Sequence, residues 1–359
     1  MAMAEALSYA HGAAHVPETA AVPAAGRRAV AAWLLVCCAL VAVMVLVGGV
    51  TRLTHSGLSI VEWQPLVGAL PPLSESGWQV VFEKYKQTPE YKVVNFGMSL
   101  AEFKGIFWWE YFHRLLGRLI GVVFFVPLAW FWVRRRLDRP LAWKLLGVFV
   151  LGGLQGALGW FMVASGLVDD PRVSHFRLTA HLGLAFLIFG VMLWTALDLL
   201  VPRRTAPANA PSRLAGWVAG LVFFQVLLGG LVAGIRAGKA YNTFPLMNGH
   251  LVPPETFVID PWWKNFFYNM ATVQLDHRLL AWLLLALVAW LWARVQWIDA
   301  DLRARAAANL LAIALAAQFA LGVWTLLTAV PVALGAAHQF IAVLVFGAAL
   351  FCAHALRKD

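Results

Sequence analysis

Eight long apolar segments limit what this chain can fold into. Crossing the hydrocarbon core of a bilayer takes about 20 apolar residues. The segments that reach this length are 29–50, 107–133, 142–164, 176–200, 214–235, 268–293, 306–329 and 332–356. In lipid, every backbone N–H group must find its partner within the segment, so each segment predicts an α-helix. We therefore expect an all-α integral membrane protein with eight transmembrane helices.

The composition agrees with a membrane protein and limits the functional classes. Hydrophobic residues make up 61% of the chain and charged residues only 13%, whereas soluble domains average about 25% charged residues. The net charge of +10 does not indicate a nucleic-acid-binding protein, because the basic residues form short clusters between the apolar segments. All three cysteines lie inside apolar segments, so we expect neither a loop disulfide nor a thiolate metal site.

The basic clusters predict the orientation in the membrane. Lys and Arg concentrate in cytoplasmic loops, and with eight spans all five clusters, such as Arg134–Arg136 and Arg303 with Arg305, fall on one face. We therefore expect a multi-pass membrane protein with both termini cytoplasmic. The long segments 51–106 and 236–267 then lie on the outer face, next to the outer ends of the helices.

The two halves of the sequence resemble each other. His113-Arg114-Leu115-Leu116 returns as His277-Arg278-Leu279-Leu280, and Gly48-Gly49 returns as Gly229-Gly230. Each half contains four apolar segments, so both halves have the same orientation, as in parallel repeats. We expect two four-helix bundles related by a pseudo-twofold axis. The predicted parts are a disordered cytoplasmic tail at 1–28, an N-terminal half at 29–200, a cytoplasmic linker at 201–213 and a C-terminal half at 214–359.

Four histidines lie inside the apolar segments near their predicted outer ends. His113 and His181 belong to the first half, and His277 and His338 belong to the second. A polar residue within the membrane is a functional candidate by default, although a lone histidine is often a hydrogen-bonded packing residue. Two histidines at one depth on neighbouring helices can approach a metal from opposite sides. The pattern therefore predicts two metal sites, each with two histidines.

Heme suits these histidine pairs better than zinc does. A structural zinc ion usually takes four ligands, often sulfur, and neither pair is accompanied by a thiol or a second carboxylate. A bis-histidine heme needs two axial nitrogens, an apolar slot and cations for its propionates. Arg52, Arg114 and Arg278 lie near the outer helix ends and are expected to bind propionates. The alternative for these arginines is that they reach the lipid–water interface as ordinary basic residues.

The residue three positions before the histidine differs between the halves. Glu110 precedes His113, whereas Gln274 precedes His277. Residues three apart share a helix face, so the first half places a carboxylate beside its heme and the second places a neutral amide. A carboxylate can stabilise a developing cation or relay a proton. We expect the reactive site in the first half and a redox cofactor in the second. The alternative for Glu110 is an ion pair with Arg114.

Several motifs of this sequence resemble those of heme A synthases. They are Gly48-Gly49-Val50-Thr51-Arg52-Leu53-Thr54, Ser56-Gly57-Leu58-Ser59, Trp63-Gln64-Pro65, Glu110-Tyr111-Phe112-His113-Arg114, Tyr241-Asn242-Thr243-Phe244-Pro245-Leu246-Met247, Gln274-Leu275-Asp276-His277-Arg278 and Ala337-His338-Gln339. The resemblance covers nearly the whole chain after residue 28. The long first outer loop is similar to that of the branch shared by alphaproteobacteria and mitochondria, and the cysteine pairs typical of the other branch are missing from the sequence.

The resemblance implies an enzyme that oxidises the C8 methyl group of heme O to a formyl group, making heme A for terminal oxidases. It implies that His113 and His181 flank the substrate heme O, with Glu110 assisting the oxidation, and that His277 and His338 ligate a heme b cofactor. It also implies a protein of the bacterial inner (plasma) membrane with its heme sites toward the periplasmic side. It leaves open whether heme O synthase, an electron-transfer partner or a second copy of the chain binds this protein.

Two other functions remain to be compared with the enzyme. A two-heme b-type electron-transfer cytochrome would also need two histidine pairs, and only the difference between Glu110 and Gln274 argues against it. A transporter would suit parallel repeats, but the sequence lacks the broken helices near the midplane that such proteins use.

Overall fold

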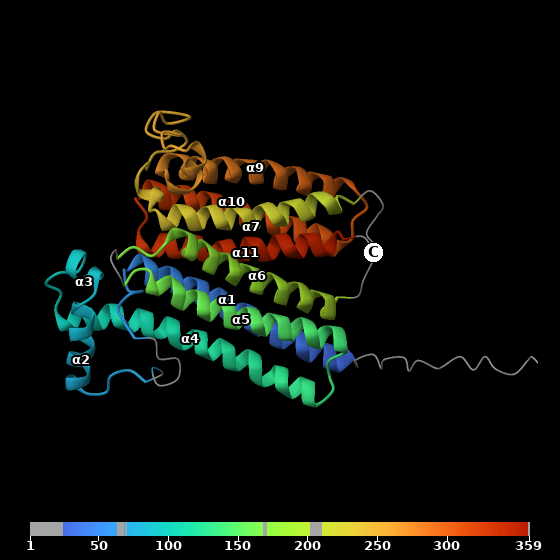
Figure 1. Cartoon of the computed structure of the whole chain (residues 1–359). Helices are drawn as coiled ribbons and strands as arrows, with labels where there is room; N and C mark the ends of the chain where they lie inside the picture. Colours follow the sequence, from blue (N-terminus) through green and yellow to red (C-terminus); the bar gives the residue numbers. More distant parts are fainter. Residues whose placement is uncertain (1–23, 63–67, 69, 168–170, 202–209, 358–359) are drawn as a thin grey trace, which may run out of the picture.

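Eight long apolar helices form the described part of the protein, which the computed structural model gives as residues 24–62, 68, 70–167, 171–201 and 210–357 (Figure 1). They are α1 (Ala24–Leu53), α4 (Leu100–Val133), α5 (Arg139–Ala164), α6 (His175–Leu200), α7 (Ser212–Gly234), α9 (Met270–Trp297), α10 (Leu302–Leu327) and α11 (Val332–Ala355). These residues contain no β-strand beyond a single bridge between Met247 and His250. The prediction of an all-α, eight-span membrane protein is therefore confirmed.

Polar side chains define where several of these helices begin. At the start of α4, Ser99 Oγ accepts a hydrogen bond from the backbone N–H of Glu102, and Glu102 Oε2 accepts one from that of Ser99. This capping box starts α4 seven residues before the apolar segment predicted at 107. Asp138, Asn269 and Asp301 cap α5, α9 and α10 in a similar way. Each cap satisfies backbone N–H groups that lack a partner within the helix and stabilises it by about 1 kcal/mol.

Four helices from both halves make the centre of the bundle. Helix α1 packs against α6 and α11, and α7 packs against α6 and α11. Helices α4 and α5 flank this centre on one side, and α9 and α10 flank it on the other (Figure 1). The main hydrophobic core draws buried residues from all eight spans, among them Leu34, Phe186 and Leu284. The two halves therefore share one continuous core.

The division into halves and their pseudo-twofold relation remain predictions from the sequence. Residues 202–209, which form most of the predicted linker, lie outside the described residues, and so do residues 1–23 of the predicted tail. The motif Trp63-Gln64-Pro65 also lies outside them.

The two long connections lie at the same end of the bundle. The first contains α2 (Glu75–Lys86) and α3 (Pro89–Val93), and the second contains η2 (Ala237–Lys239), η3 (Trp262–Lys264) and α8 (Asn265–Tyr268) (Figure 1). Helix α1 begins and α11 ends at the opposite end. An aromatic cluster attaches α2 to α4, and we call α2, α3 and this cluster the outer cap. The cluster consists of Trp78, Phe82, Tyr85, Phe103, Phe107 and Tyr111.

Candidate functional site

The structure brings the four intramembrane histidines together in the two pairs that the sequence predicted. His113 on α4 and His181 on α6 are close enough to interact electrostatically. His277 on α9 and His338 on α11 have the same relation. All four side chains are partly buried. Each half therefore brings two histidine side chains near each other within the membrane-spanning region.

A glycine on an adjacent helix lies against each of these histidines. A methyl group at Gly322 of α10 would lie 2.8 Å from Cε1 of His338, and one at Gly159 of α5 would lie 3.0 Å from Cε1 of His181. The corresponding distances are 3.5 Å from Gly48 to Nε2 of His113 and 3.4 Å from Gly229 to Cε1 of His277. A residue without a Cβ atom allows this close approach. Gly48 and Gly229 of the repeated Gly-Gly motifs thus leave room for the imidazole rings of His113 and His277.

Glutamine side chains hold the backbone of three of the histidines. The Nε2 atoms of Gln155, Gln225 and Gln318 donate hydrogen bonds to the backbone oxygens of His181, His277 and His338, at 3.0, 2.9 and 2.9 Å. These bonds connect α5 to α6, α7 to α9 and α10 to α11. The Nδ1 atoms of His181 and His338 are buried and have no hydrogen-bond partner among the described residues. These rings therefore keep a nitrogen that the surrounding protein does not satisfy.

The histidine pairs fit a heme iron better than a metal ion with more protein ligands. Among the described residues, no group of three or more His, Cys, Asp or Glu side chains could hold a metal ion, so the usual zinc coordination is not formed there. Bis-histidine heme takes one imidazole nitrogen on each side of the iron. A buried polar nitrogen without a partner costs free energy, and coordination to an iron would offset that cost. The residues present therefore suit heme.

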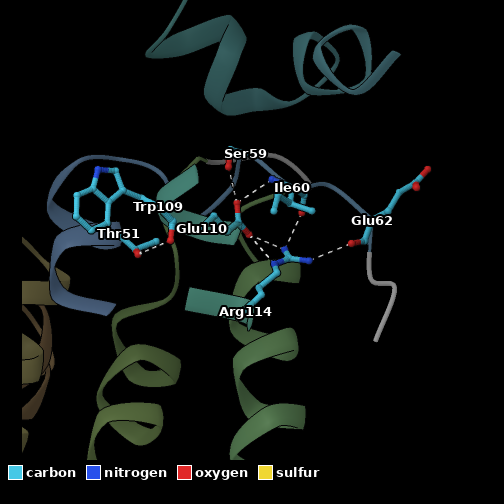
Figure 2. A network of polar contacts seen from close by, with 7 residues as sticks. All are labelled: Thr51, Ser59, Ile60, Glu62, Trp109, Glu110 and Arg114. Carbon is cyan, nitrogen blue, oxygen red and sulfur yellow. Dashed lines mark hydrogen bonds and ion pairs between the residues drawn. The ribbon is translucent and has the colours of Figure 1, made fainter. Parts of the chain in front are cut away.

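Glu110 connects helix α4 to the loop that follows α1 (Figure 2). Its carboxyl group is buried, and Oε2 accepts hydrogen bonds from the Ser59 hydroxyl and the Ile60 backbone N–H, both at 2.7 Å. Oε1 accepts two hydrogen bonds from the Arg114 guanidinium, one of them from Nε at 3.0 Å. The ion pair with Arg114, which the sequence offered as an alternative for Glu110, is therefore present.

Arg114 extends this network to the loop carbonyls (Figure 2). Its Nη2 donates to the backbone oxygen of Ile60 at 2.7 Å, and its Nη1 donates to that of Glu62 at 3.0 Å. Thr51, at the end of α1, donates to the backbone oxygen of Trp109 at 3.3 Å. The first outer loop is thus fixed to α4 directly above the turn that carries His113.

The second half has a corresponding network of opposite polarity. Arg278 donates to the backbone oxygens of Tyr241 and Thr243, at 2.9 and 3.0 Å, and to Oε1 of Gln274 at 3.1 Å. Gln274 is buried, and its Nε2 donates to the backbone oxygen of Ala237 at 3.0 Å. In the first half the loop supplies donors to a carboxylate, whereas in the second half the loop supplies an acceptor to an amide. The difference between Glu and Gln is therefore matched by the loop chemistry above each histidine pair.

The arginines predicted to bind propionates all have partners within the protein. Arg114 and Arg278 use their guanidinium groups on loop carbonyls as described above. Arg52, at the end of α1, donates from Nη2 to the backbone oxygen of Ala233 on α7 and so joins the two halves. The propionate role of these three arginines remains a prediction.

Comparisons with known proteins agree with this geometry. Residues 31–350 match the model of the cytochrome oxidase assembly protein family COX15-CtaA. A heme A synthase of Nitrosospira multiformis is 59% identical over 337 residues, which cover 93% of this chain and 95% of that protein. The chain belongs to the heme A synthase family.

Other members of the heme A synthase family are similar over nearly their whole length. The heme A synthase of Nitrosomonas eutropha is 56% identical over 327 residues, covering 90% of this chain and 92% of that protein. That of Parvibaculum lavamentivorans is 52% identical over 334 residues, covering 93% and 96%. The family resemblance that the sequence motifs indicated is therefore confirmed.

Sequence reasoning missed one buried acid in this member of the heme A synthase family. Glu90 on α3 is only 3% exposed, and its Oε2 has no hydrogen-bond partner among the described residues. Burial and, to a smaller extent, the nearby charge of Glu110 raise the pKa of Glu90 to about 8. No local pattern identified this residue, because its burial arises only when the outer cap packs on α4.

Proposed function

We propose that this protein oxidises the C8 methyl group of heme O to the formyl group of heme A. Membership of the heme A synthase family supports this proposal. The observation that carries it is the pair of buried bis-histidine arrangements, one beneath a carboxylate network and the other beneath an amide network. Two equivalent electron-transfer hemes would not need this difference.

In this proposal, the first half holds the substrate. His113 and His181 bind the iron of heme O, and the carboxylate of Glu110 lies toward the outer side of that site. Oxidation of the methyl carbon develops positive charge, which a fixed carboxylate stabilises. Because Ser59, Ile60 and Arg114 already hold this carboxylate in place, it needs no reorganisation during the reaction.

The second half holds the cofactor. His277 and His338 would ligate heme b, which supplies one-electron redox chemistry when it is bound. Gln274 and Arg278 bind the outer loop of this half without adding a carboxylate. A neutral side chain at this position suits a heme that is not itself oxidised at its periphery.

We further propose that both termini are cytoplasmic and that the heme sites lie toward the periplasm. The basic residues between α4 and α5, and Arg303 and Arg305 in the first turn of α10, lie at the end where α1 begins, opposite the outer cap (Figure 1). Cytoplasmic loops are enriched in Lys and Arg.

The experiment that tests the function uses a bacterial host that makes heme O but has no heme A synthase. The full chain is expressed there, and hemes are extracted from the membranes and from the purified protein. We expect heme A to appear only in cells that express the chain. Purified protein that contains heme b in both sites, in cells that make heme O but no heme A, would instead identify an electron-transfer cytochrome.

A further inference from the structure

The side chain of Glu90 is buried in the outer cap, and among the described residues its carboxyl group neither caps a helix nor holds a loop in place. The helix α3 that carries it is capped by Thr88, whose side chain accepts from the backbone N–H of Tyr91. The backbone oxygen of Glu90, not its carboxyl group, accepts from Val94 and Asn95. A buried polar atom without a partner, such as Oε2 of Glu90, costs free energy. A neutral side chain at this position would make the folded protein more stable.

Three ionisable groups from other elements lie within electrostatic range of Glu90. They are Tyr85 of α2, Glu110 of α4 and Arg236, which follows α7. Tyr85 is fully buried, and its hydroxyl accepts from Asn95 at 2.7 Å. Glu90 therefore lies between the outer cap, the carboxylate network of the substrate half and the second half of the protein.

The two buried carboxyl groups have opposite hydrogen-bonding states. Both oxygens of Glu110 accept hydrogen bonds, and one of them is paired with Arg114. Donors from Ser59, Ile60 and Arg114 therefore already occupy both oxygens of this carboxyl group. Glu90 has an oxygen with no such donor, and its pKa is raised to about 8. A group that titrates close to the working pH can both take up and release protons.

We propose that Glu90 exchanges protons between the substrate half and the outer solvent during the oxidation of heme O. This inference rests on the proposed function. With an oxygen atom from water, conversion of the methyl to a formyl group breaks carbon–hydrogen bonds, forms a carbon–oxygen double bond and releases four electrons and four protons. Four equivalents of a one-electron redox carrier each take one electron and are reduced. The protons leave through Glu90, which accepts each one as a carboxylate and then passes it to outer water.

The test compares Glu90→Gln with Glu83→Gln in the full-length protein. Glu83 lies on α2 in the same outer cap, but it is exposed and pairs with Lys86 at the surface. Heme A formation is measured across a pH series in the host described above, or in its membranes. Heme content is measured in the purified variants. Infrared difference spectra between low and high pH follow the titration of the carboxyl group directly and do not depend on turnover.

For Glu90→Gln we expect heme O to accumulate, heme A formation to fall by about tenfold or more, and the inflection of the pH profile to disappear. Heme content should match that of the wild type, and Glu83→Gln should behave as the wild type does. The wild type should show a carboxyl signal that titrates near neutral pH, and Glu90→Gln should lack it. A Glu90→Gln variant with the wild-type rate and pH profile would overturn the proposal.

A second variant keeps the test decisive if Glu90→Gln fails to retain heme. Glu90→Asp keeps a carboxyl group, and we expect it to make heme A with a displaced pH inflection; an unchanged profile in this variant would count against Glu90. If the wild type makes no heme A at all, the proposed function fails. The infrared titration still reports whether Glu90 exchanges a proton at neutral pH.

Discussion

Glu110 and Gln274 lie three residues before their histidines, and each binds the loop above it with opposite hydrogen-bonding chemistry. Ser59 and Ile60 donate to Glu110, whereas Ala237 accepts from Gln274. If Glu and Gln were exchanged, the amide N–H group of Gln would face the donors Ser59 and Ile60, and the carboxylate of Glu would face the backbone oxygen of Ala237. The carboxylate therefore supports the first loop, and in the proposed function it is also the charged group beside the substrate heme.

Glu110→Gln separates these two roles when it is compared with Ser59→Ala. The Gln variant removes the charge that would stabilise the oxidised carbon, so we expect heme A formation to fall by about a hundredfold while heme b stays bound. Ser59→Ala removes one hydrogen bond from the same carboxylate but keeps the charge, so we expect at most a few-fold loss. Heme analysis of both purified variants provides the measurement. Equal losses in the two variants would show that Glu110 only supports the loop.

Glu90 predicts a pH dependence of stability. Its pKa is raised from 4.5 to about 8 in the folded protein, so the folded state retains a proton that the unfolded state loses. The stability of the wild type therefore falls as the pH rises from about 4.5 to about 8, and this contribution is constant above that range. Glu90→Gln should avoid this loss, which is on the order of a few kcal/mol. Thermal unfolding at pH 5 and pH 8 measures the difference, and parallel pH dependence in the two proteins would contradict it.

Single residues were predicted well only where a membrane makes them exceptional. A histidine inside an apolar segment stands out in the sequence, and the structure brings the four together in the expected pairs, while their roles as iron ligands remain predictions. Ser59 and Glu90 carry no such signal, because serines and glutamates are common in loops. Their burial depends on how the loop after α1 and the outer cap fold back onto α4, which the sequence pattern alone does not specify.

At the level of helices, each histidine-bearing helix packs against a neighbour that presents a glycine to the ring. The sequence showed these glycines as repeated motifs but not what they contact. It also placed the start of α4 at residue 107, because the polar capping box of Ser99 and Glu102 lies outside the apolar segment. The apolar segments predicted most helix bounds closely. The bound that a capping side chain sets was recognised only in the structure.

Gly159→Ala tests the glycine contact, and Gly156→Ala on the same helix is its control. A methyl group at Gly159 would lie 3.0 Å from the ring of His181, whereas one at Gly156 meets nothing within 4 Å. We expect Gly159→Ala to move the His181 ring and to lower heme O occupancy of the first half several-fold, with heme b unchanged. Gly156→Ala should leave both hemes in place and stabilise the helix slightly. Equal heme contents in the two variants would exclude a role for the close approach.

On the scale of the whole molecule, eight spans followed directly from the length of the apolar segments. The shared core of α1, α6, α7 and α11 did not, because helices that are apolar on all sides give no sign of which face packs inward. The contact of Arg52 with Ala233 across the halves was hidden for the same reason. The sequence predicted two bundles, and the structure adds that they pack through a common centre.

Reporter fusions test the proposed orientation. A fluorescent protein that folds only in the cytoplasm, fused after residue 359, should be bright, because the basic clusters predict a cytoplasmic C-terminus. An alkaline phosphatase inserted at exposed Asn248, in the outer connection between α7 and α9, should be active, because that enzyme needs the periplasm. The reverse pattern would contradict the proposed orientation and place the histidine pairs near the cytoplasmic face.

The most direct test of the central claim is the heme content of purified His113→Ala and His277→Ala, each made in the host that supplies heme O. The two sites are assigned to different hemes, so the two variants should lose different ones. We predict that His113→Ala keeps heme b but loses heme O and heme A, and that His277→Ala loses heme b. Loss of the same heme in both variants, or heme A formation that survives in His113→Ala, would contradict the division into a substrate half and a cofactor half.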